Sequence, residues 1–92
     1  NVYPAEIEAV YAEHPDVREI AVVGVPDPRW GEVGRAYVVP APGAALDAEA
    51  LRAWGRERLA SFKLPRHFVP VEALPRTETG KVQTHRLPGR KG

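Results

Sequence analysis

The chain has 92 residues, a formal net charge of +1 and no cysteine. Its length is that of one small domain, and a net charge so close to zero creates no field that attracts nucleic acid by itself. The lack of cysteine excludes disulfides, thiolate metal ligands and cysteine nucleophiles, and it fits a reducing, cytoplasmic compartment. The sequence contains no apolar run of the roughly 18–20 residues that a membrane span needs, and no recognisable signal peptide.

The first half of the chain predicts one helix and two strands. The helix begins at Pro4, which suits the first helical turn, and it ends before Pro15. The β-branched run at residues 20–25 predicts a central strand that is covered on both faces, and residues 35–39 predict a second strand. The apolar side of the helix is expected to consist of Ile7, Val10 and Tyr11.

The second half predicts a helix, a strand and a short terminal element. Asp47 can cap the helix at its start. A strand at residues 67–71 contains Pro70, which cannot donate to a sheet ladder, so this strand is expected at a sheet edge. A short element is expected at residues 82–87, followed by a frayed tail at residues 88–92. The buried side of the second helix is expected to consist of Leu51, Trp54, Leu59 and Phe62.

This order of elements predicts an α+β fold in which helices pack on a small three-stranded sheet. The whole chain, residues 1–92, is expected to form one domain. It opens on Asn1 without a methionine and enters a helix pattern almost at once, so we expect it to be part of a longer polypeptide.

One lysine lies in a distinctive loop at residues 74–81. Pro75 cannot extend a sheet ladder and Gly80 can adopt a positive φ without strain, so the segment predicts a mobile loop that presents Lys81. An ammonium group is a point charge with three donors, which suits an anionic oxygen of a nucleotide or a carboxylate. An ordinary solvated lysine is the alternative. A Walker-type phosphate loop is excluded, because Pro75 and Val82 occupy positions where that motif needs glycine and serine or threonine.

Two aromatic residues beside cations are candidates for ligand binding. Trp30 follows Arg29 in a predicted loop, and it would serve either as a lid on the small core or as a stacking platform for a planar ligand. Phe62 and Lys63 would be either a core residue and a solvated cation or, if they lie close in space, parts of a nucleotide site.

A metal centre is not expected. The glutamates Glu6 and Glu8 are expected to be solvated residues at the start of the first helix rather than an acid–base pair. A Ser/His/Asp triad is not recognisable. No spacing typical of metal ligands is shared by the histidines His14, His67 and His85.

Several segments form a recognisable series: residues 1–8, 14–15, 21–27, 30–32, 62–65 and 75–81. In this order and spacing they resemble the C-terminal part of the adenylate-forming enzymes, a family that includes acyl-CoA synthetases, carrier-protein adenylation domains and firefly-type luciferases. The resemblance covers almost the whole chain, and it rests on several independent motifs rather than on one.

The resemblance implies a small, mobile C-terminal lid domain that moves against a larger N-terminal domain. In the family the larger domain holds ATP, Mg²⁺ and a carboxylic acid. In one pose, the lysine at the position of Lys81 assists formation of the acyl-adenylate. In the other pose, CoA or a carrier-protein thiol attacks this intermediate. The positions of Trp30 and Phe62 lie near the CoA nucleotide in CoA ligases of the family. The residues expected to bind a cofactor also include Lys63, which follows Phe62, and Gly80, which precedes Lys81.

The leading expectation is therefore the C-terminal domain of an acyl-CoA synthetase. Such an enzyme activates a carboxylic acid, here expected to be a fatty acid, with ATP and transfers the acyl group to CoA. Because the N-terminal domain of the same polypeptide would be the essential partner, the isolated chain is expected to be inactive. The alternatives are the lid domain of an enzyme that loads a carrier-protein thiol and a stand-alone binding module without catalysis.

Overall fold

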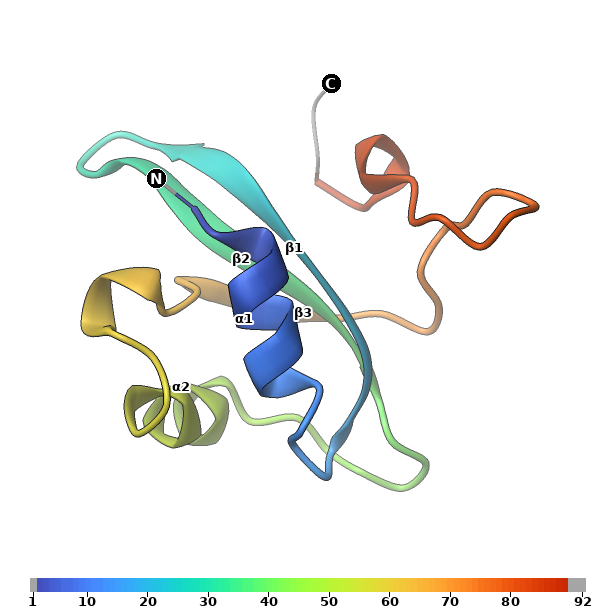
Figure 1. Ribbon diagram of the computed structural model, residues 1–92, viewed down its shortest axis with the longest axis horizontal. Coiled ribbons are helices and arrows are strands. Elements are labelled where there is room, and N and C mark those ends of the chain that lie inside the picture. Colours follow the sequence, from blue (N-terminus) through green and yellow to red (C-terminus); the bar gives the residue numbers. More distant parts are fainter. Residues whose placement is uncertain (1, 90–92) are drawn as a thin grey trace.

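The computed structural model describes residues 2–89, which contain two α-helices, two short 3-10 helices and three strands (Figure 1). In chain order these are α1 (Pro4–Tyr11), β1 (Val17–Asp27), β2 (Gly31–Pro40), α2 (Ala48–Arg56), η1 (Ser61–Lys63), β3 (His67–Pro70) and η2 (Thr84–Arg86). The strands form one sheet in the order β1-β2-β3, with β1 and β2 antiparallel and β2 and β3 parallel. The predicted α+β fold with a three-stranded sheet is therefore confirmed. No helix in this part of the chain has the length and apolarity that crossing a bilayer requires.

The position of β1 in the sheet differs from the prediction. The strand extends well beyond residues 20–25, and it lies at one edge because β2 is the strand that pairs with both others. Both faces of β1 are nevertheless covered. On its open side, the Val22 N–H donates a hydrogen bond of 2.9 Å to the carboxylate of Glu8 on α1. The unbroken apolar run therefore indicated correctly that both faces of the strand are covered. At its open edge, the backbone N–H of Val22 bonds to an acidic side chain rather than to a further strand.

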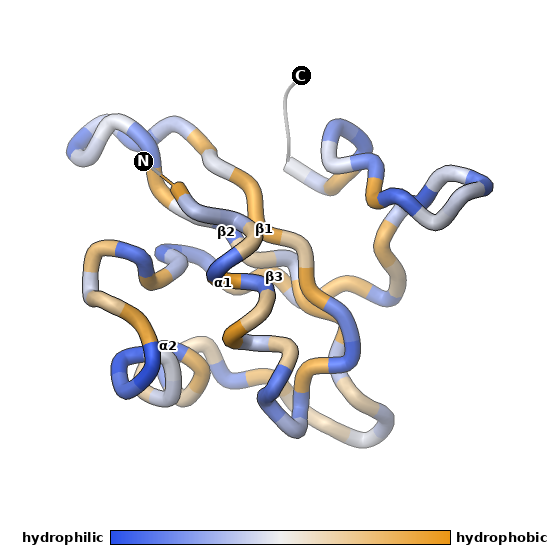
Figure 2. Tube along the Cα trace, in the orientation of Figure 1, coloured by the Kyte–Doolittle hydropathy of each residue, from blue (hydrophilic) through white to orange (hydrophobic). Residues whose placement is uncertain are grey.

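Two apolar clusters lie on opposite faces of the sheet. Alternate residues of each strand point to opposite faces, so β1 and β2 contribute to both clusters. On one face, α1 and α2 pack over Val22 and Val38. On the other face, the C-terminal segment packs over Val23 with Leu74 and Leu87 as its buried residues. Figure 2 shows that the turns at the two far ends of the molecule are hydrophilic. The predicted edge position of β3 is confirmed by its pairing with β2 at the opposite side of the sheet from β1.

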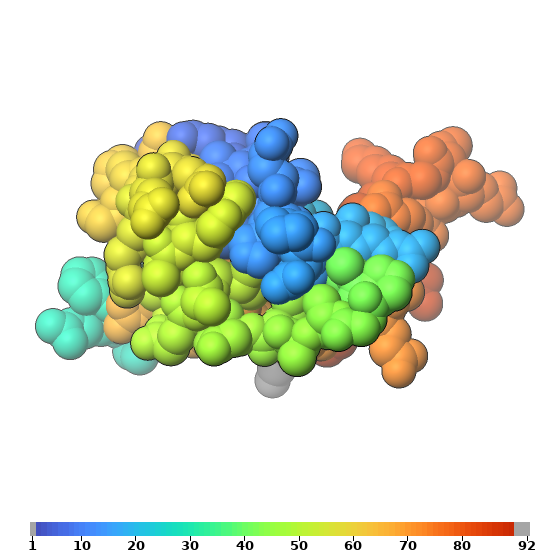
Figure 3. Space-filling view, turned by 90° about the horizontal axis from the view of Figure 1, so that it is seen from below, coloured from blue at the N-terminus to red at the C-terminus, as the bar shows by residue number. Residues whose placement is uncertain are grey.

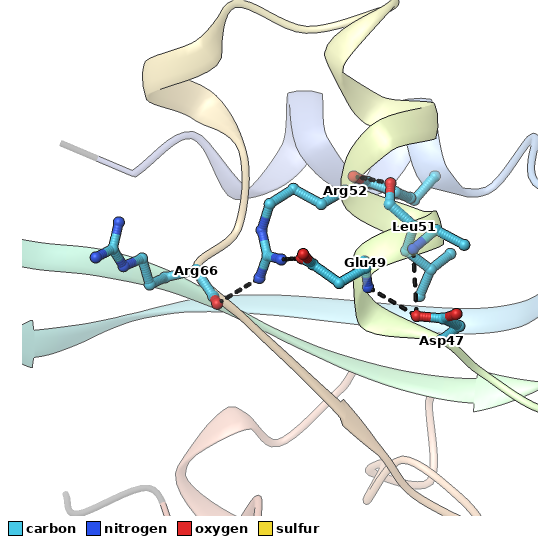
Figure 4. Close-up of polar contacts among 7 residues, drawn as sticks. Asp47, Glu49, Leu51, Arg52 and Arg66 are labelled. Atoms are coloured by element: carbon cyan, nitrogen blue, oxygen red, sulfur yellow. Dashed lines mark hydrogen bonds and ion pairs between the residues drawn. The ribbon is translucent and has the colours of Figure 1, made fainter.

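α2 packs beside α1 on the first face (Figure 3). Asp47 caps α2 as predicted, because its carboxylate accepts hydrogen bonds of 2.9 and 3.3 Å from backbone N–H groups of the first turn (Figure 4). The Tyr11 hydroxyl on α1 donates to the Leu51 carbonyl on α2 at 2.8 Å. Gly55 permits this close approach, because a Cβ at that position would collide with the Tyr11 hydroxyl and with the Leu64 side chain.

The prediction that Phe62 belongs to the buried side of the second helix is wrong. α2 ends at Arg56, and η1 then carries Phe62 outward, so that its side chain is 71% exposed. The other expected residues do face the core: Leu51 and Leu59 are buried, and Trp54 is partly buried against them. The helical period extends only as far as the helix, so it says nothing about a residue beyond the turn at its end.

Hydrogen bonds connect the end of the described chain to β2. The Tyr37 hydroxyl donates to the Pro88 carbonyl, and the Arg35 guanidinium donates to the Gly89 carbonyl at 3.2 Å. The first two residues of the predicted frayed tail are therefore anchored, through contacts with a strand that is distant in sequence. Residues 90–92, the rest of that predicted tail, lie outside the described residues, as does the first residue of the chain.

Candidate functional site

Three of the predicted cofactor-binding residues meet in one cleft. Trp30 at the β1–β2 turn and Phe62 and Lys63 on η1 line a cleft of about 360 Å³. Gly34 of β2 and Arg66, which precedes β3, also line it. The structure thus brings together residues that are far apart in the sequence, while their role in binding stays a prediction.

The β1–β2 turn presents Trp30 to this cleft. The Asp27 carboxylate accepts hydrogen bonds from the backbone N–H groups of Trp30 at 2.9 Å and Arg29 at 2.8 Å. These two bonds, that of Trp30 first, lower the pKa of Asp27. Gly31 then adopts a positive φ of 81°, which closes the turn. The Trp30 side chain is 55% exposed, so it is not a lid on the core.

Two arginines flank the Trp30 ring. The Cζ atoms of Arg29 and Arg66 lie 5.0 and 5.7 Å from the ring centroid. Neither side chain forms a salt bridge with a carboxylate among residues 2–89. The charge of Arg66 also helps to lower the pKa of Asp27. Both guanidinium groups can still interact with an anionic group that approaches the ring. No sequence pattern indicates Arg66 as a candidate, because its position beside Trp30 depends on how the β1–β2 turn folds against the segment before β3.

Lys63 differs from these arginines because its charge already has a partner. Its Nζ atom lies 2.8 and 3.1 Å from the two carboxylate oxygens of Glu6, and it lies 5.0 Å from the centroid of the Tyr3 ring. This ion pair ties η1 to α1. A carboxylate that neutralises Lys63 reduces the attraction that the lysine can offer to an anionic ligand.

Exposed aromatic side chains gather around the cleft. The rings of Tyr3 and Phe62 meet edge to face, with centroids 6.4 Å apart. Together with Trp30 they are the large hydrophobic side chains that the structure leaves exposed among residues 2–89. A group of exposed aromatic residues beside unpaired cations is typical of a surface that binds a planar, negatively charged ligand.

Lys81 and Gly80 belong to a hairpin. This segment lies at the opposite end of the molecule from the β1–β2 turn and η1, whose residues line the cleft (Figures 1 and 3). The hairpin, residues 76–82, is joined by a bridge between Arg76 and Val82. Gly80 has a φ of 91°, the positive value that its sequence position predicted, so it shapes the turn before Lys81. The Lys81 side chain is exposed and forms no salt bridge with a carboxylate of the described chain. The predicted site residues therefore fall into two groups at opposite ends of the domain.

Metal-binding side chains do not gather in the described part of the chain. Among residues 2–89, no group of three or more histidine, aspartate and glutamate side chains is arranged to hold a metal ion. The expectation that Mg²⁺ is held by a separate N-terminal domain stays a prediction.

The α+β fold of this chain and much of its sequence are shared with one known family of domains. The profile of the AMP-binding enzyme C-terminal domain matches residues 6–81, and this chain belongs to that family. It is 51% identical over 82 residues to a feruloyl-CoA synthase of Amycolatopsis sp, and 51% identical over 83 residues to an indoleacetate–CoA ligase of Aromatoleum aromaticum. These alignments cover 89% and 90% of this chain, but 17% and 16% of the two relatives.

A solved structure supports the same assignment. The o-succinylbenzoate CoA synthetase of Bacillus subtilis, in complex with its acyl-adenylate intermediate, superposes with a TM-score of 0.87 at 39% identity, over 96% of this chain and 18% of that chain. One relative is named for a different acceptor: a fatty acid–acyl-carrier-protein ligase of Streptomyces coeruleorubidus is 47% identical over 87 residues, which is 95% of this chain and 17% of the relative. The chain thus spans about a sixth of the length of the curated relatives that it matches.

Proposed function

We propose that residues 1–92 are the C-terminal domain of a longer ATP-dependent acid–thiol ligase, which converts a carboxylic acid into an acyl-adenylate and then into an acyl-CoA thioester. The observation that carries this proposal is the presence of two chemically different sites at opposite ends of one small domain (Figure 1). One offers an exposed lysine, and the other offers aromatic rings flanked by two arginines that form no salt bridge among residues 2–89. These two environments suit two successive half-reactions, if the domain turns one end and then the other toward the active site.

Lys81 acts in the first half-reaction of this proposal. A carboxylate oxygen forms a bond to the α-phosphorus of ATP, and the bond from that phosphorus to pyrophosphate breaks. Two anionic groups approach each other, so an ammonium that is placed beside them only in the transition state lowers the barrier. The exposed Lys81 can supply this charge without losing a proton. The N-terminal domain of the same polypeptide would hold ATP, Mg²⁺ and the acid.

The cleft acts in the second half-reaction. In that step the CoA sulfur forms a bond to the acyl carbon of the acyl-adenylate, the bond from that carbon to AMP breaks so that AMP leaves, and the thiol proton is released. The exposed rings of Trp30 and Phe62 offer stacking surfaces for the adenine of CoA. The guanidinium groups of Arg29 and Arg66 lie where they can donate to its phosphates. Lys63, which is paired with Glu6, would contribute less than its position suggests.

The identity of the acid belongs to a finer part of the proposal. The relatives are named for feruloyl, indoleacetate and fatty acyl substrates although they share this domain, so the domain supports a carboxylic acid without selecting its class. A fatty acid is the class that we propose first, and a comparison of fatty and aromatic acids with the full-length enzyme tests it. We also propose a cytoplasmic location, because ATP and CoA would both be substrates.

A carrier-protein thiol is the alternative acceptor, since one relative of comparable similarity is named for it. The cleft favours CoA, because a nucleotide gains from stacking and from paired phosphates, whereas a carrier-protein thiol on its flexible arm carries no adenine to stack. A stand-alone binding module would need neither Lys81 nor a partner domain, and the upstream reading frame distinguishes that alternative from the enzyme.

Binding of CoA to the full-length protein tests the proposal directly. Trp30→Ala should weaken CoA binding by about tenfold to a hundredfold, because the loss of one stacking ring has this magnitude. Trp30→Phe should retain most of the affinity, since it keeps an aromatic face. Calorimetric titration measures both. A wild-type protein that ignores CoA but acylates a carrier protein would overturn the choice of acceptor.

The two kinds of cation in the cleft allow a second comparison. Arg66→Ala should weaken CoA binding by about tenfold, because it removes a charge-assisted hydrogen bond. Lys63→Ala should weaken it by less than about threefold, because Glu6 already offsets that charge. Arg86→Ala, at an exposed arginine of η2, serves as the control and should leave CoA affinity unchanged. Equal losses for Arg66→Ala and Arg86→Ala would show that the cleft is not the binding surface.

A further inference from the structure

The hairpin that carries Lys81 is closed by its own hydrogen bonds. The Thr77 N–H donates to the Lys81 carbonyl at 2.8 Å, and the Gly80 N–H donates to the Thr77 carbonyl at 2.9 Å. The Lys81 N–H donates to the Thr77 hydroxyl at 3.1 Å. These bonds fix the shape of residues 77–81, but they do not determine how this tip is oriented relative to the sheet.

The side chain of Arg76 supplies a link between the tip and the sheet. One terminal nitrogen, Nη1, donates to the Gly80 carbonyl at 2.7 Å, directly before Lys81. The other, Nη2, donates to Glu19 Oε1 on β1 at 2.9 Å. One planar group therefore joins the residue before Lys81 to the edge strand. A guanidinium can make both bonds at once because its donors point in fixed, divergent directions.

The position of this link indicates a role in orientation rather than in folding. Side chains of Arg76 and Glu19 are 41% and 33% exposed, and exposed ion pairs contribute little to stability. The hairpin base is held independently, because Val82 packs beside the second apolar cluster and the Gln83 N–H donates to the Pro75 carbonyl at 2.8 Å. Loss of the link should therefore leave the fold intact and release only the tip.

We propose that Arg76, held by Glu19, is a positioning residue that orients the hairpin tip so that Lys81 enters the adenylation site at the correct angle. The inference rests on the proposed function, because it concerns the step that Lys81 serves. Arg76 itself need not contact the substrate. Its effect is exerted through the Gly80 carbonyl, one peptide bond away from Lys81.

The test compares Arg76→Gln, Arg76→Lys and Glu19→Gln in the full-length protein. Arg76→Gln should lower kcat of ATP–pyrophosphate exchange by roughly 10- to 100-fold with little change in KM, because a small misplacement of a catalytic group costs this much. The thioester step from supplied acyl-adenylate and the melting temperature should stay unchanged. Arg76→Lys should rescue little, since a point charge cannot hold both partners, and Glu19→Gln should show a smaller loss. Arg18→Gln, which removes an exposed arginine beside Glu19, should have no effect.

A double-mutant cycle separates this inference from the proposed function. In a Lys81→Ala background, Arg76→Gln should cause no further loss of exchange, because its effect passes through Lys81. If Lys81→Ala cripples exchange while Arg76→Gln leaves it intact, the inference fails and the proposed function stands. If Lys81→Ala itself leaves exchange intact, the proposed function fails as well. A full additional loss in the double mutant, or equal losses in both half-reactions with a lower melting temperature, would also overturn the positioning role.

Discussion

Lys81 is the residue whose substitution should separate the two half-reactions. In the full-length enzyme, Lys81→Ala should slow acyl-adenylate formation by about 10²–10³, which corresponds to about 3–4 kcal/mol, because a charge-assisted contact in a water-excluded site has this magnitude. The thioester step should be spared when pre-formed acyl-adenylate is supplied. Single-turnover measurement of each half-reaction checks this prediction.

Two further measurements make the prediction about Lys81 specific. Lys81→Arg should be little more active than Lys81→Ala, because the planar guanidinium group of arginine does not fit where the compact ammonium group of lysine acts. Thermal stability should barely change, since the side chain is exposed on a hairpin tip. Equal loss of both half-reactions would indicate a role of the hairpin in docking, and the loss of neither would show that Lys81 is not catalytic.

At the scale of elements, the contact between α1 and α2 depends on a glycine. In an isolated helix Gly55 only lowers stability, and for this reason it weakens the prediction of α2. In the structure it is buried against α1, where any Cβ would collide with the Tyr11 hydroxyl. The residue that is unfavourable for the helix alone is therefore required by the packing of the two helices.

The same contact predicts a pH-dependent stability. Burial raises the pKa of Tyr11 to about 12. The folded-state pKa lies above the unfolded value of about 10. The contribution of the neutral Tyr11 hydroxyl to the free energy of unfolding is therefore fully present below about pH 10, and it is lost as the pH rises toward about 12. In Tyr11→Phe, which loses the hydrogen bond to Leu51, unfolding free energy at about pH 8 should fall by about 1 kcal/mol.

The order of stability should reverse in alkaline solution. Each pH unit above about 10 costs the wild type about 1.4 kcal/mol through Tyr11, a cost that Tyr11→Phe does not carry. The variant should therefore become the more stable protein near about pH 11. Urea unfolding of the 92-residue chain at several pH values measures this, with Tyr3→Phe at an exposed tyrosine as the control. A constant difference at all pH values would contradict the prediction.

At the scale of the whole molecule, the hairpin at residues 76–82 and the β1–β2 turn lie at opposite ends of the domain (Figure 1). Residues 2–89 contain no group of side chains arranged for a metal ion, and the proposed function assigns ATP, Mg²⁺ and the acid to a separate N-terminal domain. The isolated chain should therefore show no ATP–pyrophosphate exchange with any of a panel of carboxylic acids, whereas the full-length protein should. Robust exchange by the isolated chain would refute this prediction.

The sequence by itself was sufficient for features that depend on near neighbours. A cap needs only the N–H groups two or three residues ahead, and a turn needs one residue that tolerates a positive φ, so Asp47 and Gly80 were assigned correctly. Pro70 likewise indicated the edge position of β3, because a missing donor acts locally. The segments that resemble the adenylate-forming enzymes are short stretches of consecutive residues, so they can be recognised in the sequence alone. The family that they indicated is confirmed by the match over residues 6–81.

Only the tertiary structure decided where distant segments meet. The edge position of β1, the outward projection of Phe62 and the cleft that joins Trp30 to Arg66 follow from which faces pack together. The link from Arg76 to Glu19 is of the same kind. Such contacts join residues tens of positions apart, and their geometry is set by burial of apolar area over the whole chain rather than by the preferences of any one segment.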